Sequence, residues 1–176
     1  MMQRSNLINL LCLQVLWFVA VIGASAGLVS PAFLILNAFM VWQLLPANRE
    51  QGDFSLVLVA LLLGFILDSS WISLGWIQYS SPNSITRLAP IWILLLWMGL
   101  ALTLNHSLAW LQQRLGLAAL CSAISSPLSY LGAERLGALQ LKGDFWLWFF
   151  SMALSWSIIV PFLLWLAHKL RTSDVI

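Results

Sequence analysis

Six long apolar stretches, separated by short polar or glycine- and proline-containing segments, constrain this chain more than any other feature. They lie at residues 7–22, 28–45, 54–76, 90–111, 115–136 and 145–168. A helix needs about 20 apolar residues to cross a hydrocarbon core roughly 30 Å thick, and the stretches are too uniformly apolar for the alternating strands of a membrane barrel. They therefore predict an all-α, polytopic helical membrane protein, with six transmembrane helices in one bundle and a single integral membrane domain over residues 1–176.

The composition excludes several other classes of protein. Hydrophobic residues make up 61% of the chain and charged residues 8%, whereas soluble domains carry about 25% charged residues. Polar side chains are thus too few to cover a water-soluble globule, and the hydrophobicity is too high for a disordered chain. Two cysteines are too few for a disulfide scaffold. A formal net charge of +2 without a long basic run argues against a nucleic-acid partner.

The first apolar stretch has two interpretations. Arg4, the apolar run and the small residues Ala24, Ser25 and Ala26 imitate a secretory signal with its cleavage site. A helix followed by a small, flexible hairpin turn explains the same residues. We expect the helix to be retained, because cleavage would leave five helices.

Basic residues and tryptophans predict how the helices sit in the membrane. With the N-terminus inside, the cytoplasmic side carries Arg4, Arg49, Arg114, Lys169 and Arg171, and the opposite side carries Arg87, Arg135 and Lys142. Cytoplasmic loops are richer in Lys and Arg, so we expect both termini in the cytoplasm. Most of the 11 tryptophans fall near the ends of the stretches, as in an interfacial aromatic belt. Trp97 and Trp156 lie deeper, where packing between helices is expected.

A first group of polar residues is predicted near the outer face of the membrane. Asp68 follows Phe54 by 14 residues, which places it ~21 Å from the cytoplasmic boundary. Tyr130 reaches a similar height on its own helix, and Glu134 and Arg135 follow one turn later. Because a charge inside a bilayer needs a partner, we expect Asp68 to accept a hydrogen bond from Tyr130 or Arg135. Such a bond either locks two helices together or marks a functional site.

A second group is predicted in the inner half of the membrane. Asn105 lies ~9 Å above the end of its stretch, and Gln14, Asn37 and Ser122 reach similar heights on other helices. Asn105 and His106 are adjacent, so on a helix their side chains point about 100° apart. Hydrogen bonding between helices and acid–base chemistry are both open for this pair. The candidate catalytic residues are therefore Asp68, Asn105 and His106.

No metal or cofactor site is predicted. The two histidines and two cysteines, His106, His168, Cys12 and Cys121, lack the helical spacing of metal ligands. A Ser-His-Asp triad is not expected either, because Asp68 and His106 differ in predicted depth by ~13 Å. The stretch 115–136 is rich in small residues, with Ser122 and Ser126 four apart and Pro127 after them. It is expected at the bundle centre, either tightly packed or lining a cavity.

Several segments resemble a family of small bacterial inner-membrane proteins catalogued as domain of unknown function 2878. The resemblance rests on residues 14–18, 64–69, 97–110 and 126–138, and the Thr-Leu-Asn-His-Ser-Leu segment at 103–108 is the most specific. Ser125-Ser126-Pro127 departs from the Gly-Gly-Pro of the family pattern, which weakens any role for close backbone approach there. Membership implies a multi-pass inner-membrane protein of unknown activity, whose genes often neighbour those of lipid-modifying enzymes.

Two functions of different classes follow as hypotheses. The first is a non-catalytic component that handles membrane lipids or other apolar molecules, with a membrane protein as a further partner. It is favoured by the scarcity of nucleophile–base pairs and of cofactor motifs. The second is a small intramembrane enzyme acting on lipids, with acid–base chemistry from Asp68, Asn105 or His106. A proton-coupled transporter is weaker, because Asp68 is the one carboxylate predicted at depth.

Overall fold

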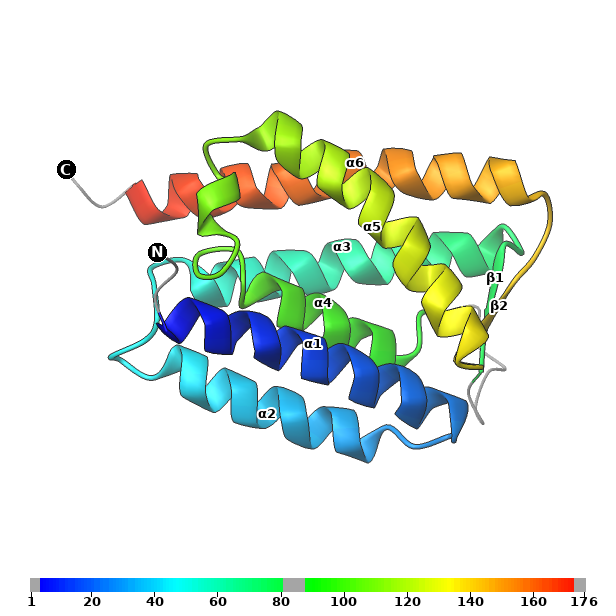
Figure 1. Ribbon diagram of the computed structural model, residues 1–176, viewed down its shortest axis with the longest axis horizontal. Helices are drawn as coiled ribbons and strands as arrows, with labels where there is room; N and C mark the ends of the chain where they lie inside the picture. The colour runs from blue at the N-terminus through cyan, green and yellow to red at the C-terminus, as the bar shows by residue number, and fades with distance from the viewer. Residues whose placement is uncertain (1–3, 81–87, 173–176) are drawn as a thin grey trace.

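The computed structural model describes residues 4–80 and 88–172, and these residues form six α-helices (Figure 1). The helices are α1 (Arg4–Ser25), α2 (Ser30–Leu44), α3 (Asp53–Ser73), α4 (Ile91–Ala101), α5 (Leu115–Arg135) and α6 (Phe145–Thr172). Each predicted stretch overlaps one of them, and α1, α3 and α6 extend beyond their stretches. Four helices, α1, α3, α5 and α6, are long and apolar enough to cross a membrane, whereas α2 and α4 are shorter.

The fourth stretch is the main correction to the predicted helices. A single helix over residues 90–111 is wrong, because α4 ends at Ala101 and the chain continues through turns into a short 3₁₀ helix, η1 (Ala109–Leu111). The backbone groups freed by this break are satisfied within the protein. Asn9 donates to the carbonyl oxygen of Leu102, and Gln112 donates to that of Leu104. Irregular backbone can lie at membrane depth when protein surrounds it in this way.

Two short strands, which the apolar pattern did not predict, join the loops at one end of the bundle. Strand β1 (Ile77–Tyr79) pairs antiparallel with β2 (Leu139–Leu141), and Gln78 lies opposite Gln140. The ribbon links the chain after α3 to the chain before α6. It also brings Tyr79, which is buried, over the end of α3.

The helices pack as neighbouring hairpins. The contacts join α1 to α2, α3 to α4 and α5 to α6, and α4 also lies against α1. In Figure 1, α5 crosses the bundle diagonally, and α1 begins at the same end where α6 finishes. Gly64 on α3 allows this packing, because a Cβ at that position would overlap the Trp97 ring. The Trp97 ring in turn stacks on Trp156, with centroids 4.5 Å apart, as expected for tryptophans buried between helices.

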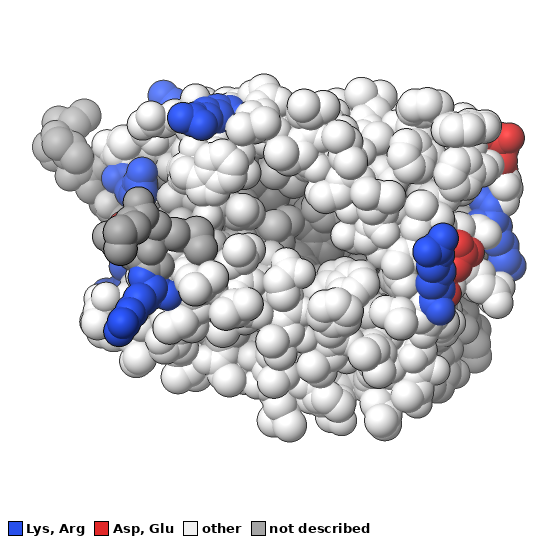
Figure 2. Space-filling view, in the orientation of Figure 1, with Lys and Arg blue, Asp and Glu red and all other residues white. Residues whose placement is uncertain are grey.

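The outer surface of the helices is apolar over most of its length. Large exposed side chains such as Leu34, Leu58 and Leu154 are each more than 60% accessible. Figure 2 shows an uncharged band between two charged ends, with Lys and Arg gathered at the end that holds both chain termini. A surface of this kind suits contact with lipid chains and not with water.

Candidate functional site

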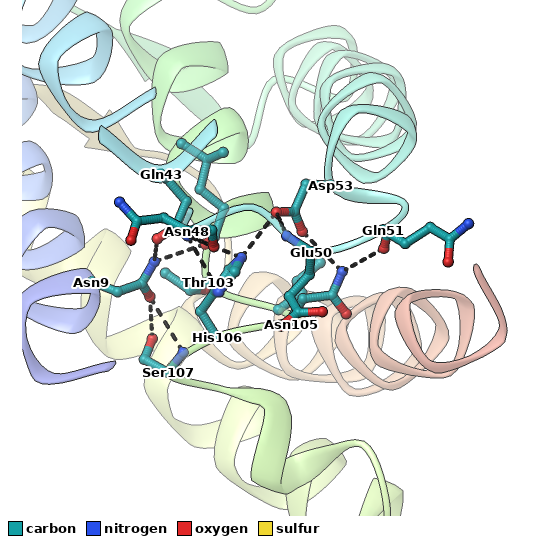
Figure 3. Close-up of polar contacts among 12 residues, drawn as sticks. Asn9, Gln43, Asn48, Glu50, Gln51, Asp53, Thr103, Asn105, His106 and Ser107 are labelled. Atoms are coloured by element: carbon teal, nitrogen blue, oxygen red, sulfur yellow. Dashed lines mark hydrogen bonds and ion pairs between the residues drawn. The ribbon is translucent and has the colours of Figure 1, made fainter. Parts of the chain in front are cut away.

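Buried polar side chains gather in two clusters at opposite ends of α3. The His106 cluster comprises Asn9, Gln43, Asp53, Asn105, His106 and Ser107 (Figure 3). The Asp68 cluster comprises Asp68, Tyr79, Trp97 and Tyr130. Asp53 is the first residue of α3 and Asp68 follows fifteen positions later, so the two carboxylates are ~22 Å apart along the helix.

Asp53 is the anionic centre of the His106 cluster. Its side chain is fully buried, and its Oδ2 lies 2.9 Å from His106 Nε2. Asn105 Nδ2 donates to Oδ1 at 2.9 Å, and the backbone N–H of Glu50 donates to Oδ2 at 2.9 Å. The position at the N-terminus of α3 adds the favourable field of the helix dipole. Three donors and a helix end therefore stabilise a carboxylate that is withdrawn from solvent.

The turn before α3 brings this carboxylate inward. Gly52 has a φ of +85°, and a Cβ there would lie 2.6 Å from Leu170 Cβ on α6. A larger residue would be strained by its backbone and would press against α6. Asp53 was missed because it lies just before the predicted stretch 54–76, in the polar segment that separates it from the stretch 28–45. An acidic residue that directly precedes an apolar run is a helix-start signal, and this signal could have identified it.

Asn9 fixes the orientation of the amides in the cluster. Its Nδ2 donates to the Leu102 carbonyl at 2.9 Å, and its Oδ1 accepts from the Ser107 hydroxyl at 2.6 Å. The oxygen of Gln43 must then face Asn9 Nδ2, 2.6 Å away. This leaves Gln43 Nε2 as a donor, and it gives one hydrogen to the Asn48 carbonyl at 3.0 Å.

The side-chain amide of Gln43 also contacts the His106 ring. Gln43 Nε2 lies 3.3 Å from Nδ1 and 3.2 Å from Nε2 of the ring. An atom nearly equidistant from both ring nitrogens lies over the ring and not along the lone pair of either one. The contact between His106 Nε2 and Asp53 Oδ2 at 2.9 Å therefore holds the imidazole in the cluster, and the Gln43 amide packs against the ring.

The break after α4 is what brings Asn105 and His106 to the same carboxylate. On a continuous helix their side chains would point about 100° apart, yet here they bond the two oxygens of Asp53. Gln112 supports the turn, donating to Asn105 Oδ1 at 3.0 Å. The straight helix from which the depth of Asn105 was counted is therefore not present.

A pocket of about 730 Å³ opens beside the His106 cluster. Its walls combine polar side chains with two tryptophans and come from α1, α2, the loop before α3, the turns after α4 and the end of α6. The lining residues are Ser5, Asn6, Trp42, Gln43, Ala47, Asn48, Glu50, Asn105, His106, Ser107, Ala109, Trp110 and Arg171. The volume falls within the range of about 300–1,000 Å³ that small-molecule sites occupy.

Asp68 is fully buried at the other end of α3 and accepts three hydrogen bonds. Tyr130 donates to Oδ1 at 2.7 Å, Tyr79 donates to the same oxygen, and Trp97 Nε1 donates to Oδ2 at 2.8 Å. Burial raises the pKa of the Tyr79 phenol and the adjacent Asp68 raises it further, so this hydroxyl stays a donor. The cluster joins α3, α4, α5 and β1.

The structure brings together only some of the expected outer group. Tyr130 meets Asp68, whereas Arg135 is exposed as the last residue of α5 and does not contact Asp68. Glu134 turns instead to β2, where its Oε1 accepts from the backbone N–H of Leu141 at 2.8 Å. Tyr79 and Trp97 take the place expected for Arg135. Tyr79 was missed because it lies outside the apolar stretches, and Trp97 because it was assigned to packing alone.

The expected inner group is likewise divided. Asn105 and His106 come together, but Gln14 and Asn37 are exposed on the outside of their helices. Asn37 donates to the Phe33 carbonyl of its own helix at 2.8 Å. Ser122 donates to the Trp156 carbonyl at 3.0 Å and so joins α5 to α6. Depth alone therefore did not identify partners, because it says nothing about which side of a helix faces the bundle.

Metal-ligating side chains do not cluster in the described ranges. No group of three His, Cys, Asp or Glu residues suited to a metal ion occurs over residues 4–80 and 88–172. Both cysteines are free: Cys12 is half-buried and Cys121 is exposed. His168 lies on α6 and its Nδ1 has no hydrogen-bond partner within the described chain.

A family model described as a protein of unknown function (DUF2878) matches residues 6–162 of the chain. The match covers all of the resembling segments and most of the six helices. No curated protein and no solved structure matches the chain.

Proposed function

Because the chain belongs to this family, whose description assigns no activity, we propose a function from the geometry itself. The protein crosses the inner membrane six times with both termini in the cytoplasm. It holds the polar end of a membrane lipid in the pocket beside the His106 cluster, without catalysing a reaction. The pocket is the observation that carries the proposal. Its lining is polar and includes Trp42 and Trp110, and it lies at the charged end of an apolar bundle.

Six crossings are compatible with the two short helices. The 15 residues of α2 span ~22 Å, and flanking apolar residues extend this length. The 11 residues of α4 span ~16 Å, and the buried irregular segment after Ala101 completes the passage. Such a segment is tolerated because the protein supplies its hydrogen bonds.

The charge distribution supports the orientation. By their places at the ends of the helices, Arg4, Arg49, Arg114, Lys169 and Arg171 lie at the end that holds the pocket, with Glu50 and Asp53, and Arg135 and Lys142 lie at the other end, with Glu134 and Asp144. Figure 2 shows that the charges gather at these two ends. An excess of basic residues favours the cytoplasmic side. The pocket then opens at the level of the lipid headgroups, where the amphipathic rings of tryptophan also prefer to lie.

The hydrogen bonds of His106 support binding over catalysis. Asp53 engages His106 Nε2, the Gln43 amide packs against the ring, and the neighbouring Ser107 hydroxyl donates to Asn9. A general base needs a free nitrogen within reach of the proton that it removes. The second candidate, an intramembrane enzyme acting on lipids, is favoured by the 2.9 Å His106–Asp53 pair, which resembles an acid–base dyad. Proton-coupled transport through Asp68 is a weaker third candidate.

Lipid retention tests the binding proposal. The full chain is purified in mild detergent and its bound phospholipid is counted by native mass spectrometry. Ala47→Trp fills the pocket from an exposed turn that has no positive φ angle, and Ala38→Trp is the control, because Ala38 is exposed on α2 outside the pocket. We expect Ala47→Trp to lose the lipid and Ala38→Trp to keep it. Equal retention by both variants would refute the proposal.

The enzyme candidate is tested in cells with His106→Ala. Normal protein abundance together with the loss of one lipid species would favour catalysis, whereas an unchanged lipid profile would support binding alone.

The orientation is tested with reporter fusions. Green fluorescent protein joined after α2 or α6 should fluoresce, and alkaline phosphatase joined after α1 or β1 should be active. The opposite pattern would refute the proposed topology.

A further inference from the structure

The pocket beside the His106 cluster carries one full charge of each sign. Glu50 comes from the loop before α3, and Arg171 comes from the last turn of α6. The other lining residues, His106 apart, are neutral side chains. The formal charge of the lining is therefore balanced, unlike the basic end of the bundle around it.

Neither charge is neutralised within the described part of the protein. The one salt bridge among described residues joins His106 to Asp53. The side chains of Glu50 and Arg171 make no hydrogen bond or ion pair with each other or with another described residue. Glu50 is exposed and Arg171 is half-buried, so both are available to a molecule that enters the pocket.

A ligand that satisfies both charges must itself carry both signs. A guanidinium binds phosphate oxygens through parallel N–H donors, and Ser5 and Asn6 provide further polar groups in the lining. A carboxylate binds an ammonium group, and tryptophan rings such as those of Trp42 and Trp110 in the lining can attract cations. An anionic headgroup without an amine would leave Glu50 unpaired and opposed to it.

We propose that the pocket selects a zwitterionic headgroup, with its phosphate against Arg171 and its ammonium against Glu50, as in an ethanolamine phospholipid. The inference rests on the proposed lipid binding and names the class of lipid. The same chemistry occurs in free phosphoethanolamine, so the source of the headgroup is part of the test.

The experiment measures binding to the delipidated full chain in detergent by native mass spectrometry. The probes are phosphatidylethanolamine, phosphatidylglycerol and soluble phosphoethanolamine. We expect the ethanolamine lipid to bind roughly tenfold more tightly than the glycerol lipid, as one charge-assisted hydrogen bond would give. Glu50→Gln should remove that preference, and Arg171→Gln should weaken both lipids by a similar factor.

Two variants serve as matched controls. Arg114→Gln removes an exposed charge at the same end outside the pocket lining, and Glu134→Gln keeps the oxygen that accepts from Leu141. Neither should change lipid preference. Elution as a single species verifies that each variant is folded. An exchange variant that carries both Glu50→Arg and Arg171→Glu keeps the formal charge of the pocket lining balanced.

The outcomes separate the inference from the proposed function. Equal binding of both lipids, blocked by Ala47→Trp, would overturn the zwitterion inference and leave lipid binding intact. Lipid binding unaffected by Ala47→Trp would overturn both. Binding of phosphoethanolamine as tightly as the intact lipid would overturn the membrane source. A preference for the ethanolamine lipid that is lost in Glu50→Gln and unchanged in both controls would support the inference.

Discussion

Asp53 offers the sharpest test of the hydrogen-bond network, because three donors converge on one buried carboxylate. Replacement by alanine leaves the ring N–H of His106, the amide of Asn105 and the backbone N–H of Glu50 without their acceptor. Each buried donor left unsatisfied costs about 1–3 kcal/mol. The adjacent pocket lets water reach part of the cluster, so we expect Asp53→Ala to lower the free energy of unfolding by about 3 kcal/mol.

The Asp53→Asn variant separates charge from shape. One amide oxygen still accepts, but the new NH₂ group faces a donor of the cluster. Both oxygens of Asp53 accept from donors in the wild type, so either orientation of the new amide places its NH₂ group against a donor. One buried donor thus stays unsatisfied, at a cost of about 1–3 kcal/mol.

Reversible unfolding of the detergent-solubilised full chain by sodium dodecyl sulfate, followed by circular dichroism, measures these costs. Glu50→Gln is the matched control, since this side chain has no partner in the described protein and its substitution should fall within about 0.5 kcal/mol of wild type. If Asp53→Ala also falls within that margin, the carboxylate does not hold the cluster together and the reasoning fails.

Two further predictions concern the packing and hydrogen bonds at the other end of α3, and the same unfolding assay checks both. Gly64→Ala forces a methyl group into the Trp97 ring and should destabilise the protein by about 1–3 kcal/mol. The control is Gly116→Ala, where a new Cβ would meet no atom within 4 Å, and it should be neutral or stabilising by up to about 1 kcal/mol. Equal effects of the two substitutions would contradict the packing of Gly64 on Trp97. Tyr130→Phe removes one of three donors to Asp68 and should cost about 1–3 kcal/mol, whereas no loss would mean that this hydroxyl contributes nothing to holding α5 on α3.

The positions of the helices could be predicted from the sequence because long apolar runs between polar segments favour helices that bond their own backbone groups. Each apolar stretch overlaps one α-helix. The break after Ala101 could not be predicted in this way. Leu102 and Leu104 are apolar and fully buried, so hydropathy is the same whether that segment is helical or irregular. The partners that decide the matter, such as Asn9, lie nearly a hundred residues away.

The candidate site was only partly predictable for a related reason. Asn105 and His106 were singled out because polar residues within an apolar stretch are costly, and the structure joins them. Asp53 was missed because a carboxylate in a polar loop ordinarily faces water. Its burial depends on Gly52 and on α6 packing over that turn, which is tertiary information. Depth counting also failed for Gln14, because it does not reveal which face of a helix is covered.

The break after α4 and the pocket are consequences of the same residues. Ending a helix at membrane depth leaves carbonyl groups without partners, and here Asn9 and Gln112 reach two of them. A chain that needed only another span would continue the helix, because no added polar residues would then be required. Instead the turn carries Asn105 and His106 to Asp53 and opens a polar cavity beside an apolar bundle. The irregular segment therefore supplies a hydrogen-bonded wall of the pocket that a straight continuation of α4 would not provide.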